Sequence, residues 1–233
     1  MKVALLGYGR MGQEIEKIAI SRGHEIVIRK KADSNIDITI ADVAIDFSLP
    51  SAAFENITNC FNNNVPVVSG TTGWLEKYKD AVALCENKKG AFIYASNFSV
   101  GVNIFFELNK HLAKLMNNIE NYNISMEEIH HTQKLDAPSG TAITLAEGII
   151  EHTTKENWEL GEIKSEKNIP IVAKRIPEVP GTHSVFYNSD VDSIEIKHTA
   201  NNRKGFALGA VIAAEWIVGK TGVFSMKDVL NIS

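Results

Sequence analysis

The sequence has few cysteines, no strong excess of either charge and no long apolar run. Its two cysteines, Cys60 and Cys85, lack the spacing of a metal site or a disulfide framework. A net charge of −4 does not favour nucleic acid or anionic membranes. The apolar runs are well short of the roughly 20 residues of a membrane span, and the run after Lys2 is too short for a signal peptide. We therefore expect a soluble, cytoplasmic protein without a metal, nucleic-acid or membrane partner.

The rest of the composition is that of an ordinary globular protein. Among 233 residues, 44% are hydrophobic and 22% are charged, enough for a sizeable core in one large domain or two small ones. Over the first 98 residues, short apolar runs alternate with segments of helical spacing. The predicted strands are 2–7, 25–29, 42–48, 65–70 and 91–96, and the predicted helices are 11–23, 50–64 and 71–90. This alternation is typical of an α/β domain with a parallel, doubly wound sheet.

The pattern changes after residue 98. Helices are predicted at 100–119 and 141–152, and extended runs at 123–130, 169–175, 182–188 and 191–198. This half predicts an α+β domain with a mixed or antiparallel sheet. An apolar helix at 205–219 is expected to return to the first domain. We therefore predict a first domain of residues 1–98 completed by 204–233, and a second domain of residues 99–203.

The first predicted strand runs into GYGRMG, which fits the G-x-G-x-x-G pattern of dinucleotide sites. Gly7 would allow a tight turn, Gly9 would let a pyrophosphate approach the backbone, and Gly12 would let the helix pack on the strand. Arg10 and Met11 lie at the helix N-terminus, where free N–H groups attract an anion. The context favours a Rossmann-type nucleotide site over a glycine-rich turn without a ligand.

Basic residues end the second predicted strand, where NAD-specific sites usually have an acidic residue. Arg29, Lys30 and Lys31 would suit the 2′-phosphate of NADPH. Asp33 could still reach a ribose, so NADH stays open as the alternative cofactor. A solvated basic turn without a ligand is the other alternative.

The segment HHTQKLDAPSGTAITLAEG begins at His130 and combines two histidines, a lysine and a turn that opens a helix. Histidine titrates near working pH and suits a general acid, and Lys134 offers a fixed positive charge. Ser139 suits a helix N-cap, and the N–H groups of Gly140 and Thr141 could bind an anion. Paired histidines on a strand are usually incidental, and S-G-T is usually only a cap. The residues alone leave both interpretations open.

A series of motifs resembles the dihydrodipicolinate reductase family, now called 4-hydroxy-tetrahydrodipicolinate reductases. In order they are GYGRMG, DFS (46–48), GTTG (70–73), SNFSVGVN (96–103), EIHHTQKLDAPSGTA (128–142) and NNRKGFALGAV (201–211). EIHHTQKLDAPSGTA fits every fixed position of the family's E-x-H-H-x-x-K-x-D-x-P-S-G-T-A. The chain departs from the family pattern in three ways. Its glycine loop is shorter than in many members, Arg29 stands where better-known members have an acidic ribose contact, and its second half is compact.

The resemblance implies NAD(P)H-dependent reduction of a cyclic dicarboxylate in lysine and diaminopimelate biosynthesis. It implies that His130 donates a proton and that Lys134 binds a substrate carboxylate and polarises the ring nitrogen. Other substrate contacts are expected from His131, Ser139, Gly140, Thr141 and Arg203. Family members are generally homotetramers formed through the second domain's sheet, so we expect the same oligomerisation here.

The resemblance also brings the loops after the fourth and fifth strands to the nicotinamide. The GTTG backbone and Thr72 would lie against its ribose and carboxamide, and Phe98 would wall the pocket or pack as a hinge aromatic. The expected contacts there are Phe47, Gly70, Thr71, Thr72, Ser96, Asn97 and Phe98.

Two alternatives stay open. A dehydrogenase of the aspartate or homoserine type would share the glycine loop but lacks the H-H-x-x-K-x-D-x-P-S-G-T sequence. A nucleotide-sensing protein with an inactive site would have no reason to keep both His130 and Lys134.

Overall fold

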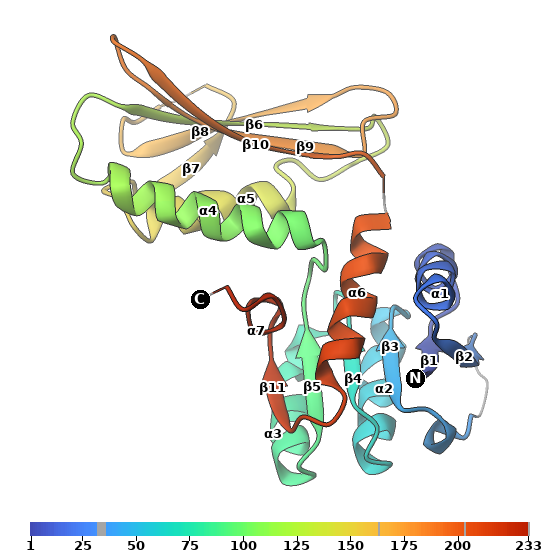
Figure 1. The fold of residues 1–233 in the computed structure, drawn as a ribbon. Coiled ribbons are helices and arrows are strands. Elements are labelled where there is room, and N and C mark those ends of the chain that lie inside the picture. The colour runs from blue at the N-terminus through green and yellow to red at the C-terminus, as the bar shows by residue number, and fades with distance from the viewer. Residues whose placement is uncertain (32–35, 163, 203, 233) are drawn as a thin grey trace. The chain divides into compact units, whose positions relative to one another are not determined.

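The computed structural model describes the whole chain except residues 32–35, 163, 203 and 233. It divides into two compact units (Figure 1). The first unit comprises Met1–Asn103 and Lys204–Ser233, and the second comprises Ile104–Arg203. No helix in the described residues is long and apolar enough to cross a membrane.

The first unit contains a six-stranded sheet in the order β11-β5-β4-β3-β1-β2, in which every pair of neighbours is parallel. The strands are β1 (Lys2–Leu6), β2 (Glu25–Lys30), β3 (Val43–Asp46), β4 (Val67–Ser69), β5 (Ala91–Tyr94) and β11 (Gly222–Phe224). β1 and β3 are buried on both faces, which is why they read as continuous apolar runs. The predicted parallel sheet is confirmed, and β11 is an additional edge strand that the sequence analysis missed.

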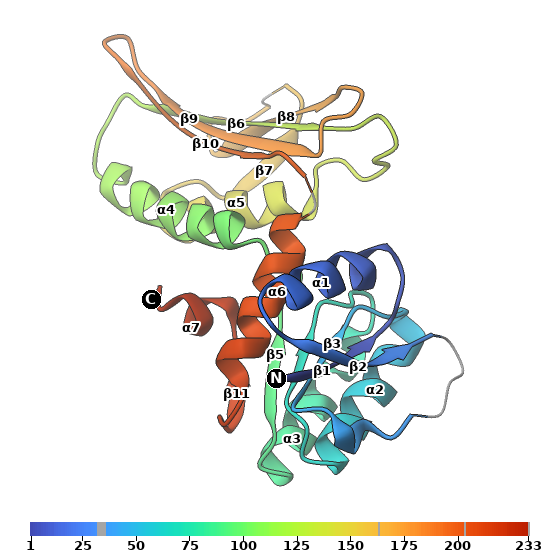
Figure 2. The ribbon, with the colours of Figure 1, turned by 45° about the vertical axis from the view of Figure 1, so that its right-hand side comes forward.

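Helices cover both faces of this sheet. The helices are α1 (Arg10–Ser21), α2 (Pro50–Asn62), α3 (Tyr78–Asn87), α6 (Lys204–Ile217) and α7 (Met226–Leu230), with 3-10 turns η1 (Ile38–Ile40) and η2 (Leu75–Lys77). On one face α1 and α6 lie side by side and bury residues such as Ile15 and Val211 with Leu5 of β1 (Figures 1 and 2). On the other face Ile57 of α2 and Cys85 of α3 pack against the sheet. The predicted helix 71–90 was too long at its start, because residues 71–77 form a loop and a 3-10 turn.

The second unit contains a five-stranded mixed sheet in the order β10-β9-β6-β8-β7. The strands are β6 (Asn123–His130), β7 (Asn157–Leu160), β8 (Asn168–Arg175), β9 (Gly181–Asn188) and β10 (Ser193–Ala200). The β6–β8 and β7–β8 pairs are parallel, and the β6–β9 and β9–β10 pairs are antiparallel. The mixed sheet is confirmed, and β7 is a short strand that the sequence analysis missed.

Two helices cover one face of the second sheet (Figure 1). They are α4 (Val100–Met116), which enters this unit at Ile104, and α5 (Gly140–Ile150). Along β6, every second residue from Ile124 to His130 is buried. Because side chains alternate across a strand, Glu128 and His130 share the buried face with the core residue Met126. This alternation brings a carboxylate and an imidazole to the end of an apolar core.

Candidate active site

The glycine loop joins β1 to α1, and two of its glycines are required by packing. Gly7 has φ +101°, and a Cβ there would lie 2.2 Å from the carbonyl oxygen of Phe47. A Cβ on Gly12 would lie 2.3 Å from the oxygen of Gly7. No heavy atom lies within 4 Å of a Cβ built on Gly9, so the backbone there faces open space. That difference fits a loop whose middle glycine leaves room for a ligand.

The N-terminus of α1 has the features of an anion site. Gly9 is the N-cap, no side chain caps this end, and the first turn contains no acidic residue. Arg10 and Met11 occupy the first helical positions. N–H groups without a side-chain acceptor and the helix dipole favour a phosphate at this point.

A cavity of about 880 Å³ begins at this loop and runs along α2. It is lined by Gly7, Tyr8, Gly9, Lys30, Lys31, Ile36, Phe47, Ser48, Leu49, Ser51, Ala52, Glu55, Asn56, Thr58, Asn59 and Asn62. Two lysines line it: Lys30, the last residue of β2, and Lys31, which follows the strand. Its size suits part of a dinucleotide.

The two predicted phosphate-binding residues on β2 have different surroundings. The Nε of Arg29 donates to Oε1 of Glu16 at 2.9 Å, and its Nη2 bonds the same oxygen. Tyr8 donates its hydroxyl to the other Glu16 oxygen. Lys30 extends its Nζ to Oδ1 of Asn56 at 2.8 Å and lines the cavity, whereas Arg29 is not among the described lining residues.

A buried carboxylate organises the loops that follow β3 and β4. Asp46 is fully buried and accepts hydrogen bonds from Asn56 Nδ2 (2.9 Å), Ser69 Oγ (2.9 Å) and Thr71 Oγ1 (2.7 Å). Burial raises the pKa of Asp46, and the hydrogen bonds oppose that shift. Thr71 also accepts the backbone N–H of Ser48 at 2.8 Å. The sequence analysis quoted Asp46 only within the DFS motif and missed this role.

The residues predicted to meet the nicotinamide divide into packed and exposed ones. Phe98 is 1% exposed, and its ring centroid lies 5.8 Å from that of Phe47. A Cβ on Gly70 would lie 2.3 Å from the Phe47 ring, so this glycine is required by packing. Thr72 and Ser96 are exposed. Asn97 accepts the backbone N–H of Ser99 at 2.9 Å. Phe98 thus packs in the core of the first unit, while Thr72 and Ser96 are accessible side chains.

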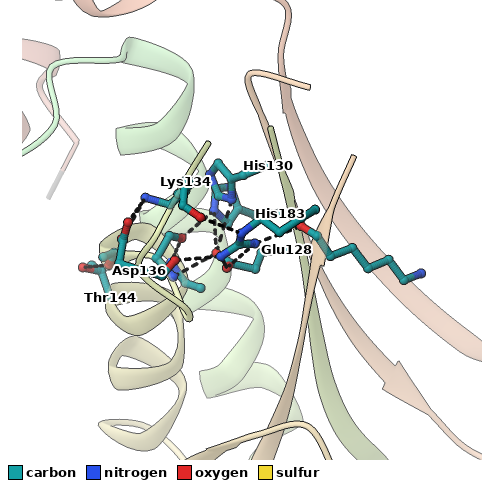
Figure 3. A network of polar contacts seen from close by, with 11 residues as sticks. Glu128, His130, Lys134, Asp136, Thr144 and His183 are labelled. Carbon is teal, nitrogen blue, oxygen red and sulfur yellow. Dashed lines mark hydrogen bonds and ion pairs between the residues drawn. The ribbon is translucent and has the colours of Figure 1, made fainter. Parts of the chain in front are cut away.

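In the second unit, His130 ends β6 beside Glu128. His130 is 8% exposed, and its Nδ1 lies 3.5 Å from Oε2 of Glu128. Burial lowers the pKa of His130, and the negative charge of Glu128 opposes that shift. The ring of His183, from β9, meets the His130 ring edge-on at 5.0 Å between centroids. Figure 3 shows these groups converging from β6, β9 and the loop before α5.

The loop after β6 is held by charge. Lys134 Nζ lies 2.8 Å from both carboxylate oxygens of Asp136, and this contact lowers the pKa of Asp136. Arg175 of β8 donates to the carbonyl oxygen of Lys134 at 3.2 Å and to that of Asp136 at 2.7 Å. The same guanidinium contacts Glu128 Oε1 at 3.3 Å. Arg175 therefore fastens the lysine loop to the strands.

The start of α5 is capped as predicted. Ser139 Oγ accepts the Ala142 N–H at 3.2 Å, and the Ser139 N–H donates to Glu128 Oε2 at 3.0 Å. His183 Nε2 lies 3.1 Å from Ser139 Oγ. A Cβ built on Gly140 meets no heavy atom within 4 Å, so the helix start faces open space beside the half-buried Thr141.

The predicted site residues of this unit only partly converge. Glu128 connects His130 to Ser139, whereas His131 is half-buried with its Nδ1 unpartnered among the described residues. Arg203 lies outside the described residues. The sequence analysis missed Arg175 and His183, and it quoted Glu128 only as a position of the motif, without a role. Glu128 could have been noticed, because it stands two residues before His130 on a strand and must share its face.

Glu128, His130 and His183 each offer one possible metal-ligand atom, and these atoms lie within 4.8 Å of one another. The sequence analysis expected no metal. Arg175 already supplies a positive charge next to Glu128, and Ser139 already donates to it. The cluster therefore has a charge partner within the protein.

Comparisons with known proteins identify the family. Residues 1–98 match the family model described as "Dihydrodipicolinate reductase, N-terminus", and residues 101–230 match the one described as "Dihydrodipicolinate reductase, C-terminus". The chain belongs to the dihydrodipicolinate reductase family. The resemblance drawn from the sequence motifs is therefore confirmed.

Individual members of the dihydrodipicolinate reductase family match over full length. A 4-hydroxy-tetrahydrodipicolinate reductase of Christiangramia forsetii is 59% identical over 235 residues, covering 99% of this chain and 98% of that protein. One from Methanoregula boonei is 34% identical over 254 residues, covering 99% of this chain and 98% of that protein. A solved structure, dipicolinate-bound dihydrodipicolinate reductase from Paenisporosarcina sp. TG-14, is 25% identical with a TM-score of 0.81 and covers 100% of this chain and 99% of that one. The predicted fold class is confirmed.

Proposed function

We propose that this protein uses NAD(P)H to reduce 4-hydroxy-tetrahydrodipicolinate to tetrahydrodipicolinate in lysine and diaminopimelate biosynthesis. Full-length similarity to reductases of that name supports the proposal. The observation that carries it is the EIHHTQKLDAPSGTA segment, in which one buried carboxylate, Glu128, contacts both the acid candidate His130 and the cap Ser139. This family membership argues against the aspartate or homoserine dehydrogenase alternative.

The first unit has the features of a dinucleotide-binding domain. When bound, a reduced nicotinamide would supply a hydride to the substrate ring. The open backbone at Gly9 and the uncapped start of α1 would hold the pyrophosphate, and the cavity along α2 would hold the adenosine part. The residues present therefore fit a dinucleotide.

The second unit would bind the dicarboxylate substrate. Lys134 would attract one carboxylate, and the N–H groups of Gly140 and Thr141 at the start of α5 would receive the other. His130 is the proton donor in this scheme. Burial favours its neutral form, and a dianionic substrate would raise its pKa and favour the protonated form. Substrate binding would thereby favour protonation of His130, which the reaction needs as its acid.

The cofactor would be NADPH in preference to NADH. Lys30 and Lys31 line the cavity beside the glycine loop, where a 2′-phosphate would meet positive charge. Arg29, which the sequence analysis placed in this role with Lys30, is paired with Glu16. We therefore assign the phosphate contact mainly to Lys30 and keep Arg29 as a minor contributor.

We also propose a cytoplasmic homotetramer assembled through the second unit's sheet. α4 and α5 cover one face of that sheet. On the other face, Val172 is 44% exposed, while its strand neighbours Ile169 and Ile171 point into the core and are fully buried. An exposed apolar side chain on an uncovered sheet face is consistent with a subunit interface.

The direct test is cofactor oxidation by the purified protein. NADPH and NADH absorbance would be followed with the product of the preceding aldol enzyme supplied or omitted. Substrate-dependent oxidation supports the reductase. Cofactor binding without substrate-dependent oxidation would instead indicate the inactive nucleotide-sensing alternative.

A further inference from the structure

Glu128 is a buried charged group of the second unit. It is fully buried on β6 and is contacted by groups from three other segments (Figure 3). Oε2 accepts the Ser139 N–H at 3.0 Å, and Oε1 lies 3.3 Å from the Arg175 guanidinium. A buried carboxylate is costly unless such partners compensate it. Ser139 and Arg175 provide such partners here.

Two buried ring nitrogens of this cluster lack a hydrogen-bond partner among the described residues, Nδ1 of His183 and Nδ1 of His130, and the one on His130 lies closer to the carboxylate. Nδ1 of His130 has no such partner, although Glu128 Oε2 is only 3.5 Å away. On the opposite side of the ring, a Cβ built on Gly181 would lie 3.1 Å from Nε2, so the glycine keeps that side clear of a side chain. Nδ1 thus faces the Glu128 carboxylate, and Nε2 faces Gly181, which has no side chain to fill the space there.

The other charged and titratable groups around His130 decide what Glu128 can do. They are Arg175 on β8, His183 on β9, and Lys134 and Asp136 on the loop. Burial, followed by the nearby His130, lowers the pKa of His183 to about 4, so His183 is neutral at working pH. Lys134 is paired with Asp136. Glu128 is the nearest carboxylate that can balance a positive charge on His130.

We propose that Glu128 is a positioning residue for the proton donor. Its carboxylate receives Nδ1–H of the protonated His130, orients Nε2–H toward the substrate, and ties that ring to the Ser139 cap of the substrate-binding helix. The inference rests on the proposed function. It adds a residue that orients the acid through one nitrogen while the other reacts.

The test is a histidine NMR titration in the presence of a chelator, comparing the protein with Glu128→Gln. The His130 resonance would be assigned with His130→Gln. Without the carboxylate, the pKa of His130 should fall further. Glu127→Gln is the matched control, because the neighbouring Glu127 lies on the other face of β6 and pairs with Lys174. An unchanged His130 titration in folded Glu128→Gln would overturn the proposal, and so would a shift that occurs only without the chelator.

Kinetics supply the second readout. An acid acts in its protonated form, so activity falls as pH rises through its pKa. In Glu128→Gln this alkaline limb of the kcat profile should move to lower pH, with a loss of about tenfold or more at neutral pH. Glu128→Asp should recover part of the rate.

Two further comparisons keep the outcomes distinct. Glu128→Gln leaves Arg175 without its carboxylate, so the double variant with Arg175→Met would be used if the single variant does not fold. If His130→Gln remains active while Glu128→Gln still shifts the His130 titration, the positioning contact stands and the assignment of His130 as the acid fails.

Discussion

The guanidinium of Arg29 on β2 is held by Glu16 on α1, with Nε 2.9 Å from Oε1. The contact lowers the pKa of Glu16, and Tyr8 shares that carboxylate. Lys30, one position later on the strand, points its ammonium to Asn56 at the cavity. Adjacent strand residues face opposite sides, so only one of the two can line a given pocket wall. This geometry separates two basic residues that the sequence presents as equivalent.

Cofactor preference should therefore follow Lys30. A charge-assisted hydrogen bond is worth roughly 1.5–3 kcal/mol. Lys30→Ala should weaken NADPH binding by about 10- to 150-fold and NADH binding much less, as measured by fluorescence titration. Arg29→Ala is the control and should change both affinities little. Equal losses for NADPH and NADH in Lys30→Ala would show that Lys30 does not read the phosphate.

Alanine substitutions at Gly12 and Gly9 should have different effects, one on stability and the other on cofactor binding. Gly12→Ala places a methyl group 2.3 Å from a backbone oxygen, so it should destabilise the fold by about 1–3 kcal/mol. Gly9→Ala meets open space and has φ −85°, so its melting temperature should hold. Its methyl group would instead obstruct the pyrophosphate and weaken cofactor binding. Thermal melts paired with NADPH titrations test this, and normal cofactor affinity in Gly9→Ala would contradict it.

His130→Gln should lower kcat by about 10²- to 10⁴-fold, the usual contribution of a general acid. The variant should fold and bind NADPH normally, because the glycine loop belongs to the other unit. His111→Gln, at an exposed position of α4, is the matched control. A loss below about tenfold would remove His130 from the donor role.

Lys134→Ala should weaken both substrate binding and rate, since it removes a charge that faces a carboxylate. Lys134→Arg keeps the charge in a different shape and should restore only part of the loss. The direct measurement is calorimetric binding of pyridine-2,6-dicarboxylate to the cofactor-loaded protein. If both variants bind this planar dicarboxylate as tightly as the parent, Lys134 is not part of the binding site.

The stability of the second unit should depend on pH through His183. Burial lowers its pKa from the ordinary 6.5 to about 4, so the unfolded chain binds this proton more readily than the folded one. This contribution to the free energy of unfolding is fully present above pH 6.5 and is lost as the pH falls toward about 4. At about 1.4 kcal/mol per pH unit, it amounts to a few kcal/mol. Denaturation of the parent and of His183→Gln between those values would test it. Parallel curves for the two proteins would exclude His183 as the source.

Much of the fold could be predicted because the spacing of apolar residues along the sequence reflects which faces of each element are buried. The continuous apolar runs of β1 and β3 and the alternation along β6 reflect how many faces of each strand are covered. The short strands β7 and β11 were missed, because three or four residues, with none buried in either strand, leave no pattern to read. Residues 71–77 were assigned to the following helix for a related reason: the start of that helix depends on a 3-10 turn, whereas periodicity locates only the helix itself.

The sequence by itself determined the chemistry that is available: a strand–glycine–helix nucleotide loop, and a strand that delivers His130 to a capped helix within a few residues. Those features are local, so residue type and spacing suffice to specify them. Only the tertiary structure decided the partners. It paired Arg29 with Glu16, buried Phe98, and joined Glu128 to Arg175, 47 residues away, and to His183. The contacts of Glu128 with Arg175 and His183 follow from β6 lying between β8 and β9, and sheet order depends on long-range packing that no single segment encodes.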